Sequence, residues 1–315
     1  SNPQWGKDIK SRSLNELIEC GIVNVDKPKG LTSYQVSDYV RRILKVKRTG
    51  HSGTLDPAVT GVLPVALGKA TRVLQVLLSA GKEYVCKMHL HKEVVEQDLR
   101  KVFCDFTGVI SQIPPVRSAV KRVVRDREIY YMDILQFQER DVTFKVGCQA
   151  GTYIRKLVHD MGLKMGCSAH MVELRRTKVG CFDESNLCSL QQLEEVYSRW
   201  KEQGDENFIR AVIQPVENAV GHLPKIWVDD GAVEPLCHGI DLAVPGISRL
   251  HEGIEPGQLV AVMTLKDELI ALGKAQLTSA QMHTQPKGIA VNLSLIHISE
   301  PTRLGMISYA VFCLK

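Results

Sequence analysis

Residues 49–72 read TGHSGTLDPAVTGVLPVALGKATR, and the rest of the chain is organised around this stretch. Its glycines are too few for a flexible linker and too many for a helix, which indicates a structured loop. Asp56 precedes Pro57, and the residue before a proline is restricted to extended geometry, so the carboxylate should be presented from a fixed loop. With His51, Ser52 and Thr54 just upstream, the loop is a candidate site that does not yet define a reaction.

Two common motifs are excluded here by single positions. A P-loop ending in the Gly-Lys pair at 68–69 would need glycine at position 63 and serine or threonine at position 70, where the chain has Leu63 and Ala70. A nucleophile elbow, Gly-x-Ser-x-Gly, starting at position 50 would need glycine where Thr54 stands. From the residues alone, a structural loop and an active-site loop are equally good interpretations.

The composition is that of an ordinary globular protein. A length of 315 residues suggests about two domains, and a hydrophobic content of 44% suffices to build their cores. The net charge of +5 is only mildly basic, so the distribution of cations matters more than their sum. Nine cysteines without a Cys-x-x-Cys pair indicate free thiols in a reducing compartment. No apolar run reaches the ~18 residues of a spanning helix, so no membrane association is expected.

Metal binding is not indicated either. His89 and His91 would share one face of a strand, and Cys167 and His170 could share one face of a helix. Neither pair has further partners at metal-ligand spacing, so ordinary packing is the simpler interpretation of both.

The segment before the loop predicts a strand, a turn and a helix. Residues 21–26 alternate like a strand and lead into the turn at 27–30. Thr32 or Ser33 can cap a helix that carries cations at positions 41–48. Such a run often marks only a solvated face, but its position directly before the Asp56 loop favours a surface that contacts phosphates. Residues 1–20 predict a polar extension with one amphipathic patch.

Further strands and two more basic clusters follow the loop. Residues 82–90 predict a strand with Tyr84 near its start, and a strand at 143–149 passes through Gly151 into a helix near Ile154. The residues alone favour a solvated Arg155 at the first turn of that helix. The segment after Pro114 alternates cations with valines, like a basic ribbon over an anionic ligand, and ELRRTKV at 173–179 is the last cluster.

The C-terminal third has a different pattern. The helical segment 191–200 is followed by a boundary at 213–215. From 224 to 291, short apolar runs are separated by glycine and proline turns, which predicts a small β-barrel. A barrel by itself says nothing about function.

The motif GHSGTLDPAVTGVLPV at 50–65 resembles the catalytic loop of the TruB family of RNA pseudouridine synthases, whose hallmark is Gly-His-x-Gly-x-Leu-Asp-Pro followed by Thr-Gly-x-Leu. The flanking sequence resembles the dyskerin group of that family, the catalytic subunits of box H/ACA ribonucleoproteins. The matching pieces occur in family order: GIVNVDKPKGLTSYQV, RRILKVKRTGHSGTLDP, SAGKEYV, PPVRSAVKR, GTYIRKLVHDMG and ELRRTKVG. The barrel segment resembles a PUA domain, an RNA-binding module.

The resemblance implies an α+β fold: a mixed, largely antiparallel pseudouridine-synthase sheet with helices, plus a small C-terminal PUA-like β-barrel. The domains expected from it are an N-terminal extension at 1–20, a catalytic domain at 21–215 and a PUA-like domain at 222–291. Residues 292–315 are expected to be an atypical tail, either foreign to the protein or a genuine divergent end.

The resemblance also implies a reaction and a set of residues. Pseudouridylation isomerises uridine in RNA without redox or group transfer, so no cofactor is expected, and the base must be flipped out of its stack. By resemblance Asp56 is the catalytic carboxylate, Arg155 pairs with it, and Tyr84 stacks on the flipped base. Whether Asp56 attacks the ring or the sugar, or removes a sugar proton, is left open.

Other residues are implied in binding. Leu174 would form an apolar wall, His51 would displace the target or support the loop, and Lys27 fits a backbone contact or a structural turn equally well. The residues implied in RNA binding are Arg48, Lys121, Arg122, Arg175, Arg176, Gly239 and Gly246.

Three function classes follow from this. The dyskerin-like motifs favour a guide-dependent synthase that acts in ribosome biogenesis. Its expected partners are a box H/ACA guide RNA, a target rRNA or snRNA, and the small companion proteins of the particle. A stand-alone tRNA T-loop pseudouridine synthase and a non-catalytic RNA-binding scaffold are the alternatives. The expected location is the nucleus and nucleolus, or the cytoplasm if the source is archaeal.

Overall fold

The computed structural model describes residues 8–114 and 123–297. The chain divides into two compact units, each described here by itself. One comprises residues 23–66 and 74–212, and the other residues 1–22, 67–73 and 213–315. Two predicted RNA contacts, Lys121 and Arg122, lie outside the described residues.

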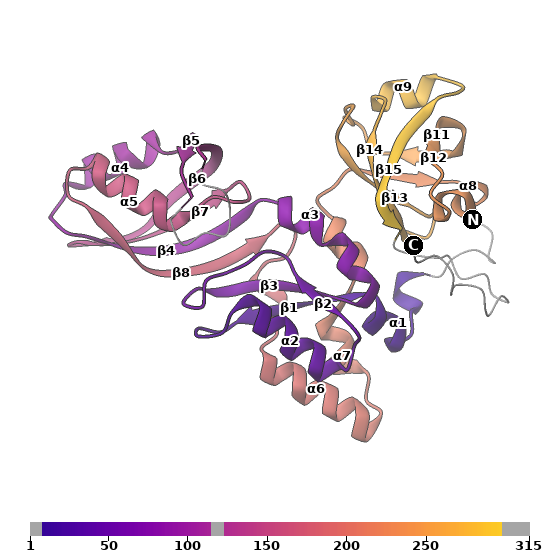
Figure 1. Cartoon of the computed structure of the whole chain (residues 1–315), viewed down its shortest axis with the longest axis horizontal. Coiled ribbons are helices and arrows are strands. Elements are labelled where there is room, and N and C mark those ends of the chain that lie inside the picture. Colours follow the sequence, from indigo (N-terminus) through magenta and orange to yellow (C-terminus); the bar gives the residue numbers. More distant parts are fainter. Residues whose placement is uncertain (1–7, 115–122, 298–315) are drawn as a thin grey trace. The chain divides into compact units, whose positions relative to one another are not determined.

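A nine-stranded mixed sheet has the order β5-β6-β7-β4-β8-β3-β1-β9, with β2 paired to β3 (Figure 1). Most of its described pairings are antiparallel, while β3 and β8 run parallel. This confirms the predicted mixed, largely antiparallel sheet. The strands are β1 (Gly21–Lys27), β2 (Thr49–His51), β3 (Thr60–Leu67), β4 (Lys82–Leu90), β5 (Gly108–Gln112), β6 (Arg125–Gln138), β7 (Asp141–Cys148), β8 (Ala169–Val179) and β9 (Ile213–Pro215).

Helices cover this sheet, and two of them build its main core with β4 and β7. Cys86, Met88 and Leu90 alternate along β4 and pack with α4 and α5, which lie against the strands in Figure 1. Because successive side chains of a strand point to opposite faces, this period of two buries one face of the sheet. The helices of this unit are α2 (Ser33–Leu44), α3 (Leu74–Ser79), α4 (Glu96–Asp105), α5 (Ile154–Lys164), α6 (Leu190–Gln203) and α7 (Asn207–Val212).

Several boundaries agree with the sequence and one does not. β4 spans the predicted 82–90, and Thr32 is the N-cap of α2 in a capping box with Gln35. The helix predicted to carry both Cys167 and His170 is wrong. The chain turns at Gly166 with φ of 68°, a left-handed conformation that glycine tolerates, and His170 lies in β8.

The second unit contains a curled half-barrel with the strand order β11-β15-β14-β13-β10-β12. Its core includes Ile226, Val260 and Ala290, all fully buried. The elements are β10 (Lys225–Val228), α8 (Asp230–Cys237), β11 (Leu242–Ala243), β12 (Ile247–Leu250), β13 (Leu259–Met263), β14 (Leu269–Ala275), α9 (Ser279–Thr284) and β15 (Ile289–His297). The last strand continues past the boundary predicted at residue 292 and pairs with β14 as far as His297.

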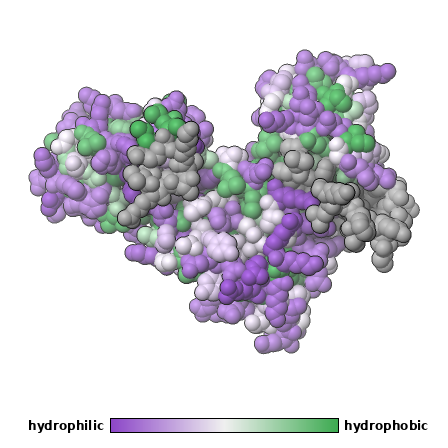
Figure 2. Space-filling view, in the orientation of Figure 1, coloured by the Kyte–Doolittle hydropathy of each residue, from purple (hydrophilic) through white to green (hydrophobic). Residues whose placement is uncertain are grey.

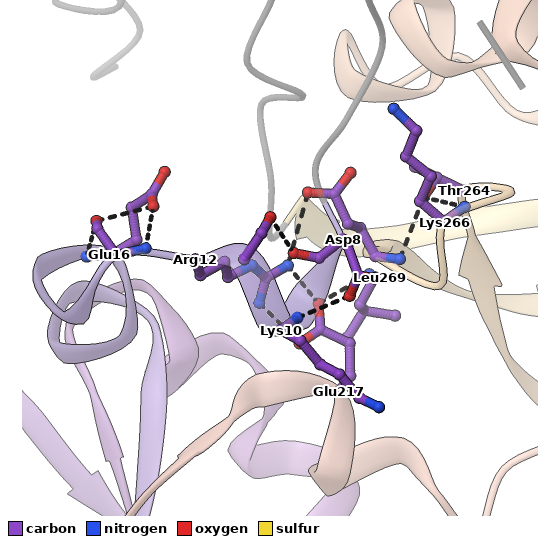
Figure 3. Close-up of polar contacts among 11 residues, drawn as sticks. Asp8, Lys10, Arg12, Glu16, Glu217, Thr264, Lys266 and Leu269 are labelled. Carbon is purple, nitrogen blue, oxygen red and sulfur yellow. Dashed lines mark hydrogen bonds and ion pairs between the residues drawn. The ribbon is translucent and has the colours of Figure 1, made fainter. Parts of the chain in front are cut away.

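The N-terminal extension belongs to this unit. Its amphipathic patch is the buried face of α1 (Leu14–Glu19). Figure 3 shows Arg12 donating two hydrogen bonds, of 2.8 and 2.7 Å, to the Glu217 carboxylate. One Glu217 oxygen also accepts the backbone N–H of Leu269, at 3.1 Å, at the start of β14. The two charged side chains are only 10% and 7% exposed, so the extension is tied to the half-barrel by a largely desolvated ion pair.

The surface is predominantly hydrophilic in the view of Figure 2, with apolar side chains in small separate patches. None of the helices within residues 8–114 and 123–297 is long and apolar enough to cross a membrane.

Candidate active site

The acid loop, residues 52–59, connects β2 to β3 and presents Asp56 to solvent. Arg155, in the first turn of α5, donates a hydrogen bond from Nη2 to Asp56 Oδ2. The two side chains are 62% and 56% exposed, so a substrate can reach the carboxylate. The pairing predicted from the motif is therefore present, and the alternative of a merely solvated Arg155 is wrong. A guanidinium hydrogen-bonded to a carboxylate fixes the orientation of that carboxylate.

Lys27 holds the part of the acid loop that follows Asp56. Its side chain is fully buried, and Nζ donates to the backbone oxygens of Pro57 and Val59 at 3.2 and 2.7 Å. Burial is the main cause that lowers the Lys27 pKa, while the Asp56 charge opposes that shift. These contacts favour the structural interpretation of Lys27. It braces the carbonyls that follow Asp56, and a side chain without exposed surface does not fit the substrate contact predicted for it.

Ser33 holds the loop on the other side of Asp56. Its hydroxyl accepts the Leu55 N–H at 2.8 Å and donates to the Leu55 carbonyl at 3.3 Å. Ser33 is 1% exposed and begins α2. The sequence had placed this serine only as a candidate helix cap. Its contact with the acid loop was not predicted, since it depends on how α2 packs.

Tyr84 and Arg176 form a second group beneath the loop. They lie opposite each other on the neighbouring strands β4 and β8. Burial raises the pKa of the Tyr84 hydroxyl, and the Arg176 charge partly opposes this. Arg176 also donates from Nε to Val62 O at 2.8 Å and from Nη2 to Gly53 O at 3.4 Å.

His51 and Leu174 are the two other residues predicted to bind substrate. Burial is the main cause that lowers the His51 pKa, followed by the Arg176 charge, and His51 Nδ1 has no hydrogen-bond partner among the described residues. Leu174 is buried in the same core as Leu55 of the acid loop. Base displacement by His51 and a pocket wall at Leu174 stay predictions.

Comparisons with known proteins agree with this geometry. The family model of the TruB pseudouridylate synthase N-terminal domain matches residues 41–154, that of the tRNA pseudouridylate synthase B C-terminal domain matches 155–221, and a PUA model matches 224–296. The probable tRNA pseudouridine synthase B of Thermococcus kodakarensis is 54% identical over 94% of this chain and 88% of its own length. The chain belongs to the TruB family of pseudouridine synthases.

Solved structures are similar throughout this TruB-family chain. A Cbf5-Nop10-Gar1 complex contains a chain that is 54% identical with a TM-score of 0.90, covering 93% of this chain and 90% of that one. An H/ACA ribonucleoprotein bound to a substrate RNA containing 2′-deoxyuridine contains one that is 50% identical with a TM-score of 0.89, covering 95% and 92%. The PUA match runs five residues past Val291, so the family pattern extends beyond the point where the sequence had suggested that it ends.

The basic cluster of this TruB-family enzyme at 173–179 differs from the expected basic surface. Arg175 donates to Asp26 at 3.0 and 3.2 Å and to Glu184 at 2.7 Å, so two carboxylates compensate its charge. Arg176 is 1% exposed and does not fit the predicted RNA contact. The β4–β8 register shifts between Arg176 and Lys178, which breaks the alternation of the strand: Arg176 is buried and Lys178 is exposed. Arg48, before β2, is exposed as an RNA contact requires.

The glycines predicted to contact RNA lie in the half-barrel. Gly239 is exposed after α8 and has φ of 89°, which side chains rarely adopt. At Gly246 a Cβ atom would lie 3.0 Å from the Ala232 Cβ, so a larger residue would crowd α8. RNA binding at these positions stays a prediction.

Histidines at the far end of β4 show no ligand geometry. His91 Nε2 lies 2.8 Å from His170 Nδ1, and His89 Nδ1 lies 2.7 Å from an Asp141 oxygen. No group of three or more histidine, cysteine or acidic side chains in the described ranges could hold a metal ion.

Proposed function

We propose that this chain is the catalytic subunit of a guide-dependent RNA pseudouridine synthase. The observation that carries the proposal is the exposed Asp56–Arg155 pair on a braced loop, within a chain that is 50% identical to one in an RNA-bound H/ACA particle. A loop held at Leu55 and at Pro57 presents the intervening carboxylate in one geometry, and such preorganisation is what a catalytic group needs.

The isomerisation of uridine needs a carboxylate and a surface for the flipped base, and this site supplies both. The C1′–N1 bond of uridine breaks, the base rotates, and a C1′–C5 bond forms while the C5 proton is lost and N1 gains one. No electron acceptor or transferred group takes part. Asp56 supplies the carboxylate, Arg155 orients it, and the Tyr84 ring offers a face for the flipped base.

Target choice is the part that the guide would supply. Exposed cations such as Arg48 attract any RNA backbone and carry no sequence information. We therefore assign target selection to base pairing with a box H/ACA guide whose end is anchored by the half-barrel around Gly239 and Gly246. Nop10 and Gar1, present in the similar Cbf5 complex, define the class of companion proteins. Target rRNA or snRNA and a role in ribosome biogenesis belong to this proposal.

One observation favours a second candidate function. The similar curated proteins of Thermococcus kodakarensis and Pyrococcus furiosus are named as probable tRNA pseudouridine synthase B. A stand-alone enzyme acting on the tRNA T-loop is the alternative. These relatives are archaeal, so within this proposal the cytoplasm is the location for an archaeal source, and the nucleus and nucleolus apply only to a eukaryotic one.

A reconstitution separates the two functions. Purified protein is mixed with a target RNA or a tRNA, with and without a matching guide and companion proteins, and pseudouridine is mapped. We expect weak modification by the protein alone and strong modification in the complete mixture. Changing the pairing sequence of the guide should move the modified uridine. Efficient T-loop modification that is indifferent to the guide would establish the stand-alone function instead.

A further inference from the structure

The turn before α2 and the first residue of that helix are hydrogen-bonded to the acid loop on both sides of Asp56. After Asp56, the backbone N–H of Gly30 donates to Pro57 O at 2.8 Å. Before Asp56, the Ser33 hydroxyl accepts the Leu55 N–H at 2.8 Å. Residues 29–34 are thereby fixed beside the catalytic carboxylate.

Two side chains of this fixed segment are exposed and make no polar contact with the described residues. Lys29 is exposed in the turn, and Tyr34 is 74% exposed at the start of α2. Lys29 directly precedes Gly30 and Tyr34 directly follows Ser33, so the two hydrogen bonds limit how far each residue can lie from Asp56. With standard backbone dimensions, the Cα atoms of Lys29 and Tyr34 lie at most about 12 Å and about 14 Å from that of Asp56.

Tyr34 lies on the side of α2 that faces β2, the strand that leads into the acid loop. An α-helix turns by about 100° per residue, which places Tyr34 about 60° from Ser37 around the helix axis. The Ser37 hydroxyl donates to Thr49 Oγ1 in β2 at 3.0 Å. Tyr39 is also exposed, at 45%. It lies about 140° from Tyr34 around the axis, so the two tyrosines are on different sides of the same helix.

An aromatic ring and a cation in this place match the chemistry of an unpaired nucleotide. Single exposed aromatic side chains are common on protein surfaces and need no ligand by themselves. Beside a carboxylate that acts on a flipped base, however, the nucleotide next to the target has lost its stacking partner. A tyrosine ring can replace that partner because every base has a face on which to stack, and a lysine ammonium can bind the phosphate.

We propose that Tyr34 and Lys29 hold the nucleotide adjacent to the target uridine. The Tyr34 ring stacks on the base of that nucleotide, and the Lys29 ammonium contacts its phosphate. The proposal rests on the proposed synthase function and adds a binding position beside the catalytic carboxylate. Holding the neighbour offsets part of the cost of unstacking the target. A stacking surface accepts any base, so the contact leaves target choice to the guide.

The first arm of the test measures binding in the complete mixture, with Asp56→Asn as the parent so that no turnover occurs. Tyr34→Ala should weaken binding of the target RNA by roughly tenfold, the size of one lost base–aromatic stack, whereas Tyr34→Phe should bind like the parent. An abasic site on one side of the target uridine should abolish this difference, because the stacked base is then missing.

Tyr39→Ala is the matched control for this arm. It removes an exposed tyrosine from the other side of α2 and should bind RNA like the parent. The stacking role of Tyr34 would be overturned by an unchanged affinity of Tyr34→Ala, or by a loss that persists with an abasic site on either side of the target. An equal loss for Tyr39→Ala would overturn it as well.

The second arm tests Lys29 through the salt dependence of RNA binding. Each phosphate contact adds to the slope of log Kd against log salt concentration, so Lys29→Met should reduce that slope by about one unit. Lys92→Met removes an exposed lysine from the connection after β4 and should leave the slope unchanged. If Lys29→Met leaves the slope at the parent value, or if both variants reduce it equally, the phosphate contact of Lys29 is wrong.

The third arm needs no activity. The base 2-aminopurine, whose fluorescence is quenched by stacking, is placed beside the designed target uridine. In the bound RNA its fluorescence should be higher with Tyr34→Ala than with the wild type or Tyr34→Phe, and equal fluorescence would count against the proposal. Tyr34 and Lys29 are exposed, so their variants should keep the circular dichroism of the wild type. If the wild-type mixture forms no pseudouridine, the proposed function fails, and this fluorescence still decides whether a base rests on Tyr34.

Discussion

At the residue scale, the carboxylate of Asp56 is the group on which the assignment depends. Asp56→Asn keeps the size of the side chain and removes its charge. We expect isomerisation to fall below detection while RNA binding persists, because the exposed cations that attract RNA remain. On the same preparation, pseudouridine mapping measures the isomerisation and a binding titration measures the RNA affinity. Turnover comparable to that of the wild type would remove Asp56 from the reaction.

Ser33 tests whether the loop must be held for chemistry. Ser33→Ala leaves the buried Leu55 N–H without its acceptor, so we expect about 1–3 kcal/mol of lost stability together with a lower rate at saturating RNA. Ser37→Ala on the same helix is the matched control, since it removes a buried hydroxyl bonded to Thr49 at the start of β2, outside the acid loop. That variant should lose stability without a comparable loss of rate. If Ser33→Ala and Ser37→Ala lose rate equally, the slower chemistry reflects lost stability and not the hold of Ser33 on the acid loop.

At the element scale, Lys82 connects the start of β4 to the end of α3. Its Nζ donates to three carbonyls that close the helix, at Leu77, Leu78 and Ala80, with distances of 3.0, 2.7 and 2.7 Å. Burial is the main cause that lowers the Lys82 pKa to about 8, and the nearby Arg176 charge contributes. A buried lysine in this position is a structural cap, and its proton should be linked to folding.

The sign of that linkage follows from proton counting. Between about pH 8 and about pH 10.5 the unfolded chain holds the Lys82 proton and the folded chain releases it, so stability should rise with pH in that window. From about pH 7 to about pH 9.5 the gain is up to about 2 kcal/mol. The free energy of unfolding of the wild type and of Lys82→Met is measured with denaturant at about pH 7 and about pH 9.5. The gain that only the wild type shows is the contribution of Lys82. A difference between the two proteins that does not change with pH would contradict the lowered pKa.

β8 shows how one element can carry two kinds of arginine. The strand lies between β4 and β3, and its alternation places Leu174 and Arg176 on the buried side while Arg175 lies on the other. β3 approaches so closely that a Cβ atom on Gly61 would lie 2.2 Å from the Arg176 carbonyl oxygen. Glycine at this point of the TruB motif is thus required for packing, beyond any role in the flexibility of the loop.

At the scale of the whole molecule, the end of the half-barrel can be tested by truncation. β15 pairs with β14 beyond Val291, with Leu293 opposite Gly273 and Ile296 opposite Leu272. A chain ending at Val291 loses these pairs, so its melting temperature should fall by several degrees relative to a chain ending at His297. Equal melting temperatures for the two truncations would place the end of the functional domain near 291, as the sequence alone had suggested.

The sequence by itself determined the family, the mixed sheet with a separate barrel, the bounds of β4, the cap of α2 and the pairing of Asp56 with Arg155. The strand bounds and the helix cap depend on local periodicity and on capping residues, whereas the Asp56–Arg155 pairing joins residues 99 positions apart and was implied only by the family resemblance. The positions of Lys27, Ser33 and Arg176 were decided by the tertiary structure. A cation in a strand gives no local sign of which face it will occupy. That choice is made when neighbouring strands cover one side and their backbone oxygens replace water around the charge.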